Sequence, residues 1–212
     1  MNIRTTLICI TDIRTNSHKK NFDMKIRDSG MPEESMWSRF FDPEIILQQM
    51  GVTSDLYSIV DLGCGFGTFS IPASKIVTGK VHAFDIDNEM IRQLKEKIEL
   101  QNISNIELHL HDFIAEGSGL PINSVDYIML FNILHHDNPV QIMNEVYRIL
   151  KPGKCAGIIH WRSDIRTPRG PQLDIRPTPE QCKRWALESG FSIHKELILE
   201  PYHFGIIVSK IK

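Results

Sequence analysis

The chain has 212 residues, 42% of them hydrophobic and 24% charged, a composition that suits one globular domain with a core of ordinary size. Its 24 Lys and Arg nearly balance 26 Asp and Glu, so no strong basic field attracts nucleic acid or an anionic membrane. No apolar run reaches the roughly 18 residues that span a bilayer, and the apolar patch at 7–10 is too short for a signal-peptide core. We therefore expect a cytoplasmic protein with no membrane span and no nucleic-acid partner.

The cysteines are scattered along the chain without the C-x-x-C spacing that is typical of zinc sites. They are Cys9, Cys64, Cys155 and Cys182. We expect reduced thiols, no disulfide framework and no metal site, with Cys155 and Cys182 buried as small apolar side chains.

The N-terminal residues 1–32 show no sustained helical or strand periodicity and include a polar stretch at 16–21. We expect a poorly ordered arm there, followed by a single domain over 33–212. Trp37 and Phe41 stand at the start of that domain. They suit either an aromatic lid over a substrate or the apolar face of a short packed helix.

Beyond the arm, compact apolar runs alternate with helical patterns. Asp42 as N-cap, Pro43 in the first turn and Gly51 as the stop predict a short helix. Helices are also predicted over 88–100 and along the apolar face of 142–150, the latter ended by Pro152 and Gly153. Strands are predicted near 57–61, 80–85, 106–110, 125–131 and 155–161.

The C-terminal region adds one more helix and a hairpin. Thr178 and Gln181 have the spacing of a capping box, and Gly190 ends the helix that they open. Two strand-like runs at 192–199 and 202–211 follow, with so short a turn between them that they must be antiparallel neighbours. The βαβ alternation followed by this hairpin predicts an α/β fold with a doubly wound sheet that is parallel except for one strand.

A glycine-rich turn follows the first predicted strand. Asp61 stands near the end of that strand, and the turn then runs Gly63, Cys64, Gly65, Phe66, Gly67 before a helix opens. Such a turn lets a ligand approach the backbone at the carboxyl edge of the sheet. The glycines run G-x-G-x-G, whereas dinucleotide-binding turns use G-x-G-x-x-G, so the spacing departs from the NAD pattern.

Acidic side chains follow the first three strands at the edge where the turn lies. Asp61, Asp85 and Asp112 are these acids, and three carboxylates repel a pyrophosphate and favour a ligand with positive charge, ribose hydroxyls and an amine. S-adenosylmethionine carries all of these groups.

Each acid then receives a predicted role. Asp85 accepts hydrogen bonds from the ribose hydroxyls, Asp61 holds the methionine end, and Asp112 with Phe113 takes the adenine amine. Ile86 and Met90 flank the adenine, although core packing explains Met90 equally well.

The combination of motifs resembles the class I S-adenosylmethionine-dependent methyltransferases, and most of all their type 11 branch, typified by the ubiquinone and menaquinone C-methyltransferases. The resemblance covers roughly 37–212. It is carried by the turn at 60–69, Asp85, Asp112, the stretch at 124–136 and the segment at 145–153. It implies a three-layer Rossmann-like fold with seven strands in the order 3-2-1-4-5-7-6, strand 7 antiparallel, and methyl transfer to a small molecule by in-line displacement.

The resemblance also assigns cofactor contacts, which fall on the three acids and on Asn132 after the fourth strand. Phe131-Asn132-Ile133-Leu134 stands where enzymes that methylate adenine bases or glutamine side chains have Asn/Asp-Pro-Pro-Tyr/Phe. Those two acceptor classes are therefore disfavoured.

Candidate catalytic and substrate residues lie at the same edge. His135 and His136 follow the fourth strand and suit a general base, or else bond only to the loop backbone. His160 at the end of the fifth strand and Arg162 beyond it are candidate substrate contacts. Guanidinium groups in this link suit an acidic acceptor, and pairing of the arginines with Asp164 and Asp174 explains them without a substrate.

Two other functions compete with the methyltransferase interpretation. A non-catalytic module that binds the nucleoside cofactor, or that keeps the fold as a scaffold, would be expected to have lost Asp61, Gly65 or Asp85, and all three are present. An NAD-dependent oxidoreductase is disfavoured by the glycine spacing. The acceptor atom and the oligomeric state stay open at this point.

Overall fold

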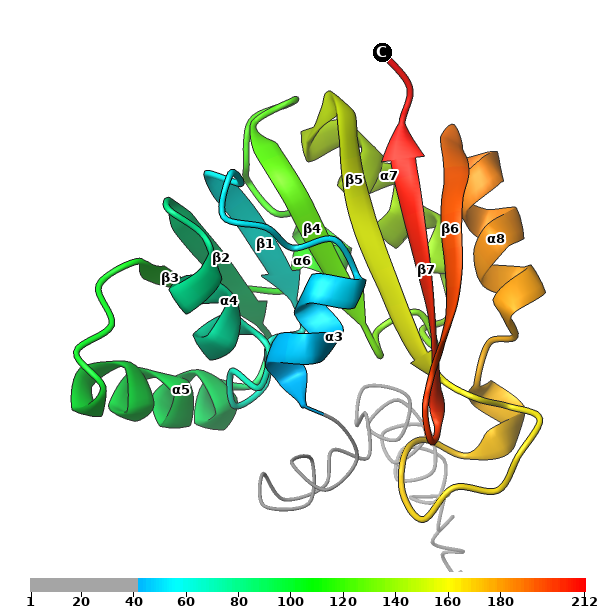
Figure 1. Cartoon of the computed structure of the whole chain (residues 1–212), viewed down its shortest axis with the longest axis horizontal. Coiled ribbons are helices and arrows are strands. Elements are labelled where there is room, and N and C mark those ends of the chain that lie inside the picture. The colour runs from blue at the N-terminus through cyan, green and yellow to red at the C-terminus, as the bar shows by residue number, and fades with distance from the viewer. Residues whose placement is uncertain (1–41) are drawn as a thin grey trace, which may run out of the picture.

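Residues 42–212 are described by the structure, which is a computed structural model (Figure 1). The predicted N-terminal arm, together with Trp37 and Phe41, lies outside the described residues. None of the described helices is long and apolar enough to cross a membrane.

A seven-stranded sheet with the order β3-β2-β1-β4-β5-β7-β6 runs through the described residues. Only β7 runs against its neighbours β5 and β6, so the predicted order and the predicted terminal hairpin are both confirmed. The strands are β1 (Ser58–Leu62), β2 (Lys80–Asp85), β3 (Ile106–Leu110), β4 (Val125–Phe131), β5 (Leu150–Trp161), β6 (Phe191–Leu199) and β7 (His203–Lys210).

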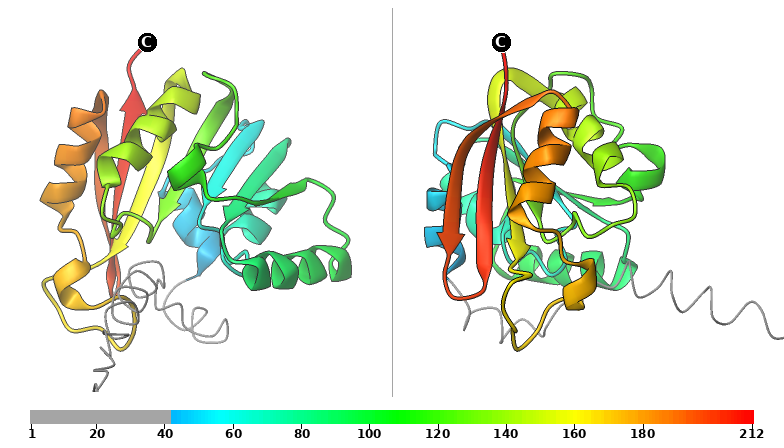
Figure 2. Two further views of the ribbon diagram at one scale, coloured as in Figure 1. Left: turned by 180° about the vertical axis from the view of Figure 1, so that it is seen from behind. Right: turned by 90° about the vertical axis from the view of Figure 1, so that its right-hand side faces the viewer.

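Helices cover both faces of this sheet (Figures 1 and 2). One face carries α3 (Pro43–Gln49), α4 (Ser70–Ile76) and α5 (Asn88–Leu100). The other carries α6 (Phe113–Glu116), α7 (Pro139–Ile149) and α8 (Pro179–Glu188), and the short 3-10 helix η1 (Leu173–Ile175) lies in the link before α8. The described residues therefore form three layers, as the sequence predicts.

Helix caps fix the boundaries where the sequence places them. Asp42 Oδ1 accepts from the Glu44 backbone N–H at 2.9 Å at the start of α3. The capping box of α8 is present in both directions, because Thr178 Oγ1 accepts from Gln181 N and Gln181 Oε1 accepts from Thr178 N. Each such cap satisfies N–H groups that have no partner inside the helix.

Apolar side chains on both faces hold the parallel strands in register. Every residue of β4 is buried, as a central strand covered on both faces requires. Val60 and Phe84 belong to the core on the α7 side, and Ile59 and Val81 to the core on the α3 side. This packing brings the carboxyl ends of β1, β2 and β4 to one edge.

One predicted boundary is wrong. The helix expected to include Leu150 and to end at Pro152 and Gly153 ends at Ile149, and β5 begins at Leu150 instead of at 155. Leu150 has extended backbone angles and pairs with Val125 on β4. Its fully buried side chain fits the apolar pattern of a helix and of a strand equally well, so periodicity alone assigned it to the wrong element.

Candidate active site

The glycine-rich turn is held against the end of β2. The backbone N–H groups of Gly63 and Cys64 both donate to the Phe84 carbonyl at 2.9 Å. Gly63, Gly65 and Gly67 have φ angles of 78°, 51° and 82°, a region that favours glycine. A Cβ on Gly67 would also collide with the buried side chain of Leu94. Bare backbone is therefore required at this turn, as the predicted close approach of a ligand demands.

Asp61 lies almost wholly buried behind the turn, with 3% of its surface exposed. The Ser70 hydroxyl, on the first residue of α4, donates to its Oδ2 at 2.5 Å. Burial raises the pKa of the Asp61 carboxyl to about 7; the nearby Asp85 adds to this effect and the Ser70 hydrogen bond opposes it. A cation nearby would stabilise the ionised carboxylate, which fits the predicted contact with the methionine end.

Asp85 ends β2 and faces the turn. Its Oδ2 accepts from Gly65 N at 2.8 Å, and its Oδ1 accepts from Asp87 N at 2.9 Å at the start of α5. Burial raises the pKa of Asp85 above its usual value, and these backbone hydrogen bonds oppose that rise. A carboxylate has about four acceptor positions, so the two backbone contacts orient the group and leave capacity for a diol.

The predicted adenine contacts surround the ends of β2 and β3. Asp112 caps α6 by accepting from Ala115 N at 3.1 Å, and Phe113 is part of the buried core on the α7 side. Ile86, directly after Asp85, is 47% exposed, while Met90 is half-buried on α5. The exposed Ile86 suits the predicted flank of the adenine, and direct contact by Phe113 stays a prediction.

Two buried oxygens near this edge have no hydrogen-bond partner among the described residues. They are Asn132 Oδ1, directly after β4, and Thr68 Oγ1, directly after the glycine turn. Asn132 has a φ of 59°, and its backbone N–H donates to the Ile159 carbonyl at 2.8 Å. Leaving a buried polar atom unpaired costs roughly 1–3 kcal/mol, so both atoms fit acceptors for a ligand's donors.

The donors of S-adenosylmethionine match this set of acceptors. Its ammonium, ribose hydroxyls and adenine amine are hydrogen-bond donors that need oxygen acceptors. The ends of β1, β2 and β4 present such oxygens around the glycine-rich turn. The sequence predicted Asn132 but missed Thr68 and Ser70. The signal that could have identified them is a hydroxyl side chain close to the turn: Thr68 directly follows the turn, and Ser70 is the first residue of α4.

The histidines near the fourth and fifth strands separate into two environments. His135 is buried, and its Nδ1 lies 3.4 Å from Nε2 of the fully buried His160. Burial and the nearby His135 lower the pKa of His160 well below its usual value, so His160 is neutral at pH 7. His136 is partly exposed and its Nδ1 accepts from Asn138 N at 3.5 Å, which is a contact with the loop backbone.

Two arginines in the link after β5 are occupied within the link itself. Arg162 forms a two-point ion pair with Asp164, at 3.0 and 2.8 Å. Arg176 is buried and donates to the carbonyls of Pro171, Arg162 and Arg169. The predicted pairing of an arginine with Asp164 is confirmed, and a substrate contact by Arg162 or by the buried His160 stays a prediction.

Comparison with known proteins finds similarity to methyltransferases both by family profile and by sequence. Residues 59–153 match the profile of a family described as a methyltransferase domain. The chain is 26% identical over 202 residues to aklanonic acid methyltransferase DauC of Streptomyces sp. (strain C5), covering 85% of this chain and 87% of that protein.

Two further matches are shorter. Over 99 residues the chain is 30% identical to the demethylmenaquinone methyltransferase of Listeria welshimeri, covering 45% of this chain and 41% of that enzyme. Over 109 residues it is 34% identical to the ribosomal protein L11 methyltransferase of Thermoanaerobacter pseudethanolicus, covering 50% of this chain and 33% of that enzyme. The chain thus spans less than half the length of both enzymes.

A solved structure extends the likeness to the whole sheet. A SAM dependent methyltransferase from Aquifex aeolicus superposes with a TM-score of 0.75 at 26% identity, covering 87% of this chain and 96% of that one. The strand order, the glycine turn and these relatives agree with one another. Residues 59–153 therefore form a methyltransferase domain, and over the described residues the chain has the fold of the class I S-adenosylmethionine-dependent methyltransferases.

Proposed function

We propose that this protein transfers a methyl group from S-adenosylmethionine to a small organic molecule. The observation that carries the proposal is the set of acceptor groups at one edge of the sheet. It comprises the buried carboxylate of Asp61, the half-buried carboxylate of Asp85, and the oxygens of Thr68 and Asn132 that have no partner among the described residues. Such a set of hydrogen-bond acceptors suits a cationic nucleoside. The link after β5 and the loop after β4 then remain available to contact the molecule that receives the methyl group.

The protein's own part in the reaction is chiefly to hold two reactants in line. When bound, S-adenosylmethionine supplies a methyl group already activated on a sulfonium. Asp85 orients the ribose, Asp61 the ammonium end, and Asn132 a donor near the end of β4. Fixed alignment of this kind contributes up to roughly 7–11 kcal/mol to lowering a barrier, so the acceptor needs a base only if it must lose a proton.

His135 and His160 are the proposed route for such a proton. The two rings lie 3.4 Å apart at their closest nitrogens, and burial keeps His160 neutral. A proton accepted at His135 can be shared with the neighbouring ring of His160. His160 then acts through His135, because His160 itself has no exposed surface.

The names of two relatives support a small acceptor. Aklanonic acid and demethylmenaquinone are both organic molecules of modest size. The L11 enzyme instead modifies a protein, and its match covers only a third of its length. A protein acceptor is therefore the second candidate.

A cytoplasmic location belongs to the same proposal, because the described cysteines are free thiols and reducing compartments keep thiols in that state.

A labelled methyl-transfer screen tests the proposal. The purified full chain is incubated with methyl-labelled S-adenosylmethionine and, separately, with small-molecule extract, protein extract and tRNA. We expect label in the small-molecule pool, lost with Asp85→Asn and retained with Glu99→Gln, an exposed acid on α5. Label confined to the protein or tRNA pool would contradict the small-molecule acceptor while leaving the cofactor assignment standing.

The proposed proton route has its own measurement once an acceptor is known. His135→Gln is expected to lower kcat roughly 10²–10⁴-fold for an acceptor that must lose a proton, with little change in cofactor affinity. His136→Gln is the matched control, since its ring contacts the loop backbone. Equal losses in both variants would contradict a specific role for His135.

A further inference from the structure

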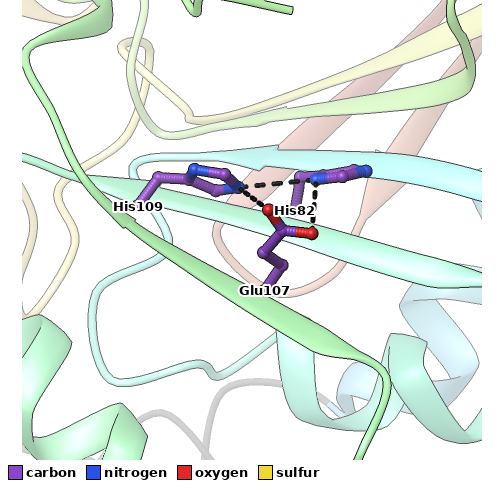
Figure 3. Close-up of side chains that lie close together, drawn as sticks. All are labelled: His82, Glu107 and His109. Carbon is purple, nitrogen blue, oxygen red and sulfur yellow. Dashed lines mark hydrogen bonds and ion pairs between the residues drawn. The ribbon is translucent and has the colours of Figure 1, made fainter.

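Two histidines and a glutamate lie close together on β2 and β3, the outer strands of the sheet (Figure 3). His82 Nδ1 and His109 Nε2 lie 3.4 Å apart. Glu107 lies between the rings, with Oε2 3.8 Å from His82 Nδ1 and Oε1 3.7 Å from His109 Nε2. Three potential ligand atoms, one from each residue, thus lie within 4.8 Å of one another.

The register of β2 and β3 creates this cluster. His82 pairs with Glu107, and Phe84 with His109, so all four side chains lie on the same face because alternate residues of a strand share a face. The Phe84 ring stacks on His109 with centroids 4.2 Å apart and an angle of 9°. Since Phe84 is buried, this contact fixes the orientation of the His109 ring.

The spacing of the three groups suits a tetrahedral metal ion. Ligand atoms about 2.0–2.2 Å from Zn²⁺ lie about 3.3–3.5 Å from one another in tetrahedral geometry. The ring nitrogens already have this separation, and one ligand atom from each of the three side chains lies within 4.8 Å of the others. Imidazole binds metals in its neutral form through one ring nitrogen, and each ring offers one nitrogen to the cluster.

The exposure of the three side chains and the residues around them determine how readily an ion reaches the cluster. The exposed side-chain fractions are 14% for His82, 24% for His109 and 48% for Glu107, so solvent reaches the cluster. Lys80 Nζ lies 3.4 Å from Glu107 Oε2 and competes for that carboxylate. His111, which directly follows β3, lies with its Nε2 2.7 Å from the Gly117 carbonyl and outside the cluster.

We propose that His82, Glu107 and His109 bind one divalent transition-metal ion of the Zn²⁺ type, with the remaining coordination position open to water. Two imidazoles and one carboxylate form a donor set that such ions favour. The ion would link β3, at the edge of the sheet, to β2. The sequence predicted no metal site because only the cysteine spacing was considered; the signal was Glu107-x-His109 on one strand opposite His82 on the next.

Calorimetric titration of ZnCl₂ into the untagged, chelator-treated full chain tests this site. We expect one equivalent to bind, and His109→Gln and Glu107→Gln each to weaken binding at least tenfold. His194→Gln, which removes an exposed histidine from β6, is the matched control and should bind as the wild type does. Lys80→Gln should strengthen binding several-fold, because it removes a positive charge that competes for Glu107.

Two outcomes would overturn the proposal. One is the absence of stoichiometric Zn²⁺ binding to the wild-type chain, and the other is binding that His109→Gln and Glu107→Gln leave unchanged. Circular dichroism establishes that each variant is folded before the comparison. Co²⁺ provides a second measurement, because its visible absorption reports coordination geometry, and the tetrahedral signal expected for the wild type should be lost in His109→Gln.

Discussion

At the scale of single residues, Asp61 combines burial, a hydroxyl partner and a pKa close to neutrality. Its carboxyl is 3% exposed, and its pKa is raised to about 7 from 3.8. The folded state therefore favours the protonated carboxyl, and ionisation opposes folding. The stabilising contribution of the protonated form is fully present below pH 3.8, falls as the pH rises toward 7, and is lost above it.

The stability of Asp61→Asn relative to the wild type should consequently increase as the pH rises. At about 1.36 kcal/mol for each pH unit, the free energy of unfolding of the wild type should fall relative to the variant by about 3 kcal/mol between pH 5 and pH 8. Urea denaturation at both values measures this difference. The exposed Glu99→Gln should show no such trend, and a parallel pH dependence of Asp61→Asn and wild type would contradict the raised pKa.

The same carboxyl links cofactor affinity to pH. A ligand ammonium near Asp61 favours the ionised form, so binding should release a proton when the free protein is below pH 7. The ratio of wild-type to Asp61→Asn affinity for S-adenosylmethionine should rise about tenfold from pH 6 to pH 8. Titration calorimetry at the two values gives this ratio, in which titration of the cofactor's own amine cancels. A constant ratio would mean that Asp61 does not sense the bound cation.

Sequence reasoning could identify these acids because each follows a compact apolar run, a position that depends on local pattern alone. It could not identify Thr68 as an unpaired acceptor, because that property depends on the absence of neighbours within reach, and those neighbours come from distant parts of the chain. The His82 cluster was missed for a related reason. Its members are 25 and 27 positions apart, and only the register of β2 with β3 brings them together.

At the scale of elements, the glycine turn is restrained by backbone conformation and by packing together. Gly67 has a φ of 82°, and an added Cβ would collide with Leu94, which is fully buried on α5. Gly119 has a similar φ of 71° but nothing within 4 Å of an added Cβ. The two positions therefore separate the conformational cost from the steric one.

Gly119→Ala should lower the free energy of unfolding by roughly 1–2 kcal/mol, the cost of a left-handed conformation. Gly67→Ala should cost roughly 1–3 kcal/mol more, because Leu94 must move within a filled core, and it should also weaken S-adenosylmethionine binding. Chemical denaturation and calorimetry measure both effects. Equal destabilisation by the two substitutions would show that the contact with Leu94 does not restrain the turn.

The boundaries of the elements follow the sequence where a polar N-cap or a glycine marks them, and depart from it at Leu150, which is neither. Asp42, Thr178 and Gly190 mark ends that the structure reproduces to within a residue or two. At the end of α7 the C-cap is Leu150, which has extended backbone angles, and the chain passes directly from α7 into β5. Pairing with Val125 on β4 decided that boundary, and such a contact is not visible in a local pattern.

At the scale of the whole molecule, the strand order brings separate functional segments to one edge. The alternation of strands and helices predicts a parallel sheet, the short terminal connection predicts an antiparallel hairpin, and the family resemblance supplied the order that the structure shows. The hydrogen-bond partners within the link between β5 and α8 could not be predicted from the sequence. Arg176 is buried and bonds to three carbonyls of that link, an arrangement set by the path of a loop without periodicity.

We propose above that the carboxyl edge of β1, β2 and β4 binds S-adenosylmethionine, with Asp85 holding the ribose. Calorimetric titration of S-adenosylmethionine into the full chain and into Asp85→Asn tests it most directly, with NADH as the competing ligand. We predict one site for S-adenosylmethionine in the wild type, affinity at least tenfold weaker in Asp85→Asn because hydrogen bonds to a charged acceptor are lost, and no comparable binding of NADH. Affinity unchanged by Asp85→Asn, or tighter binding of NADH, would contradict the account.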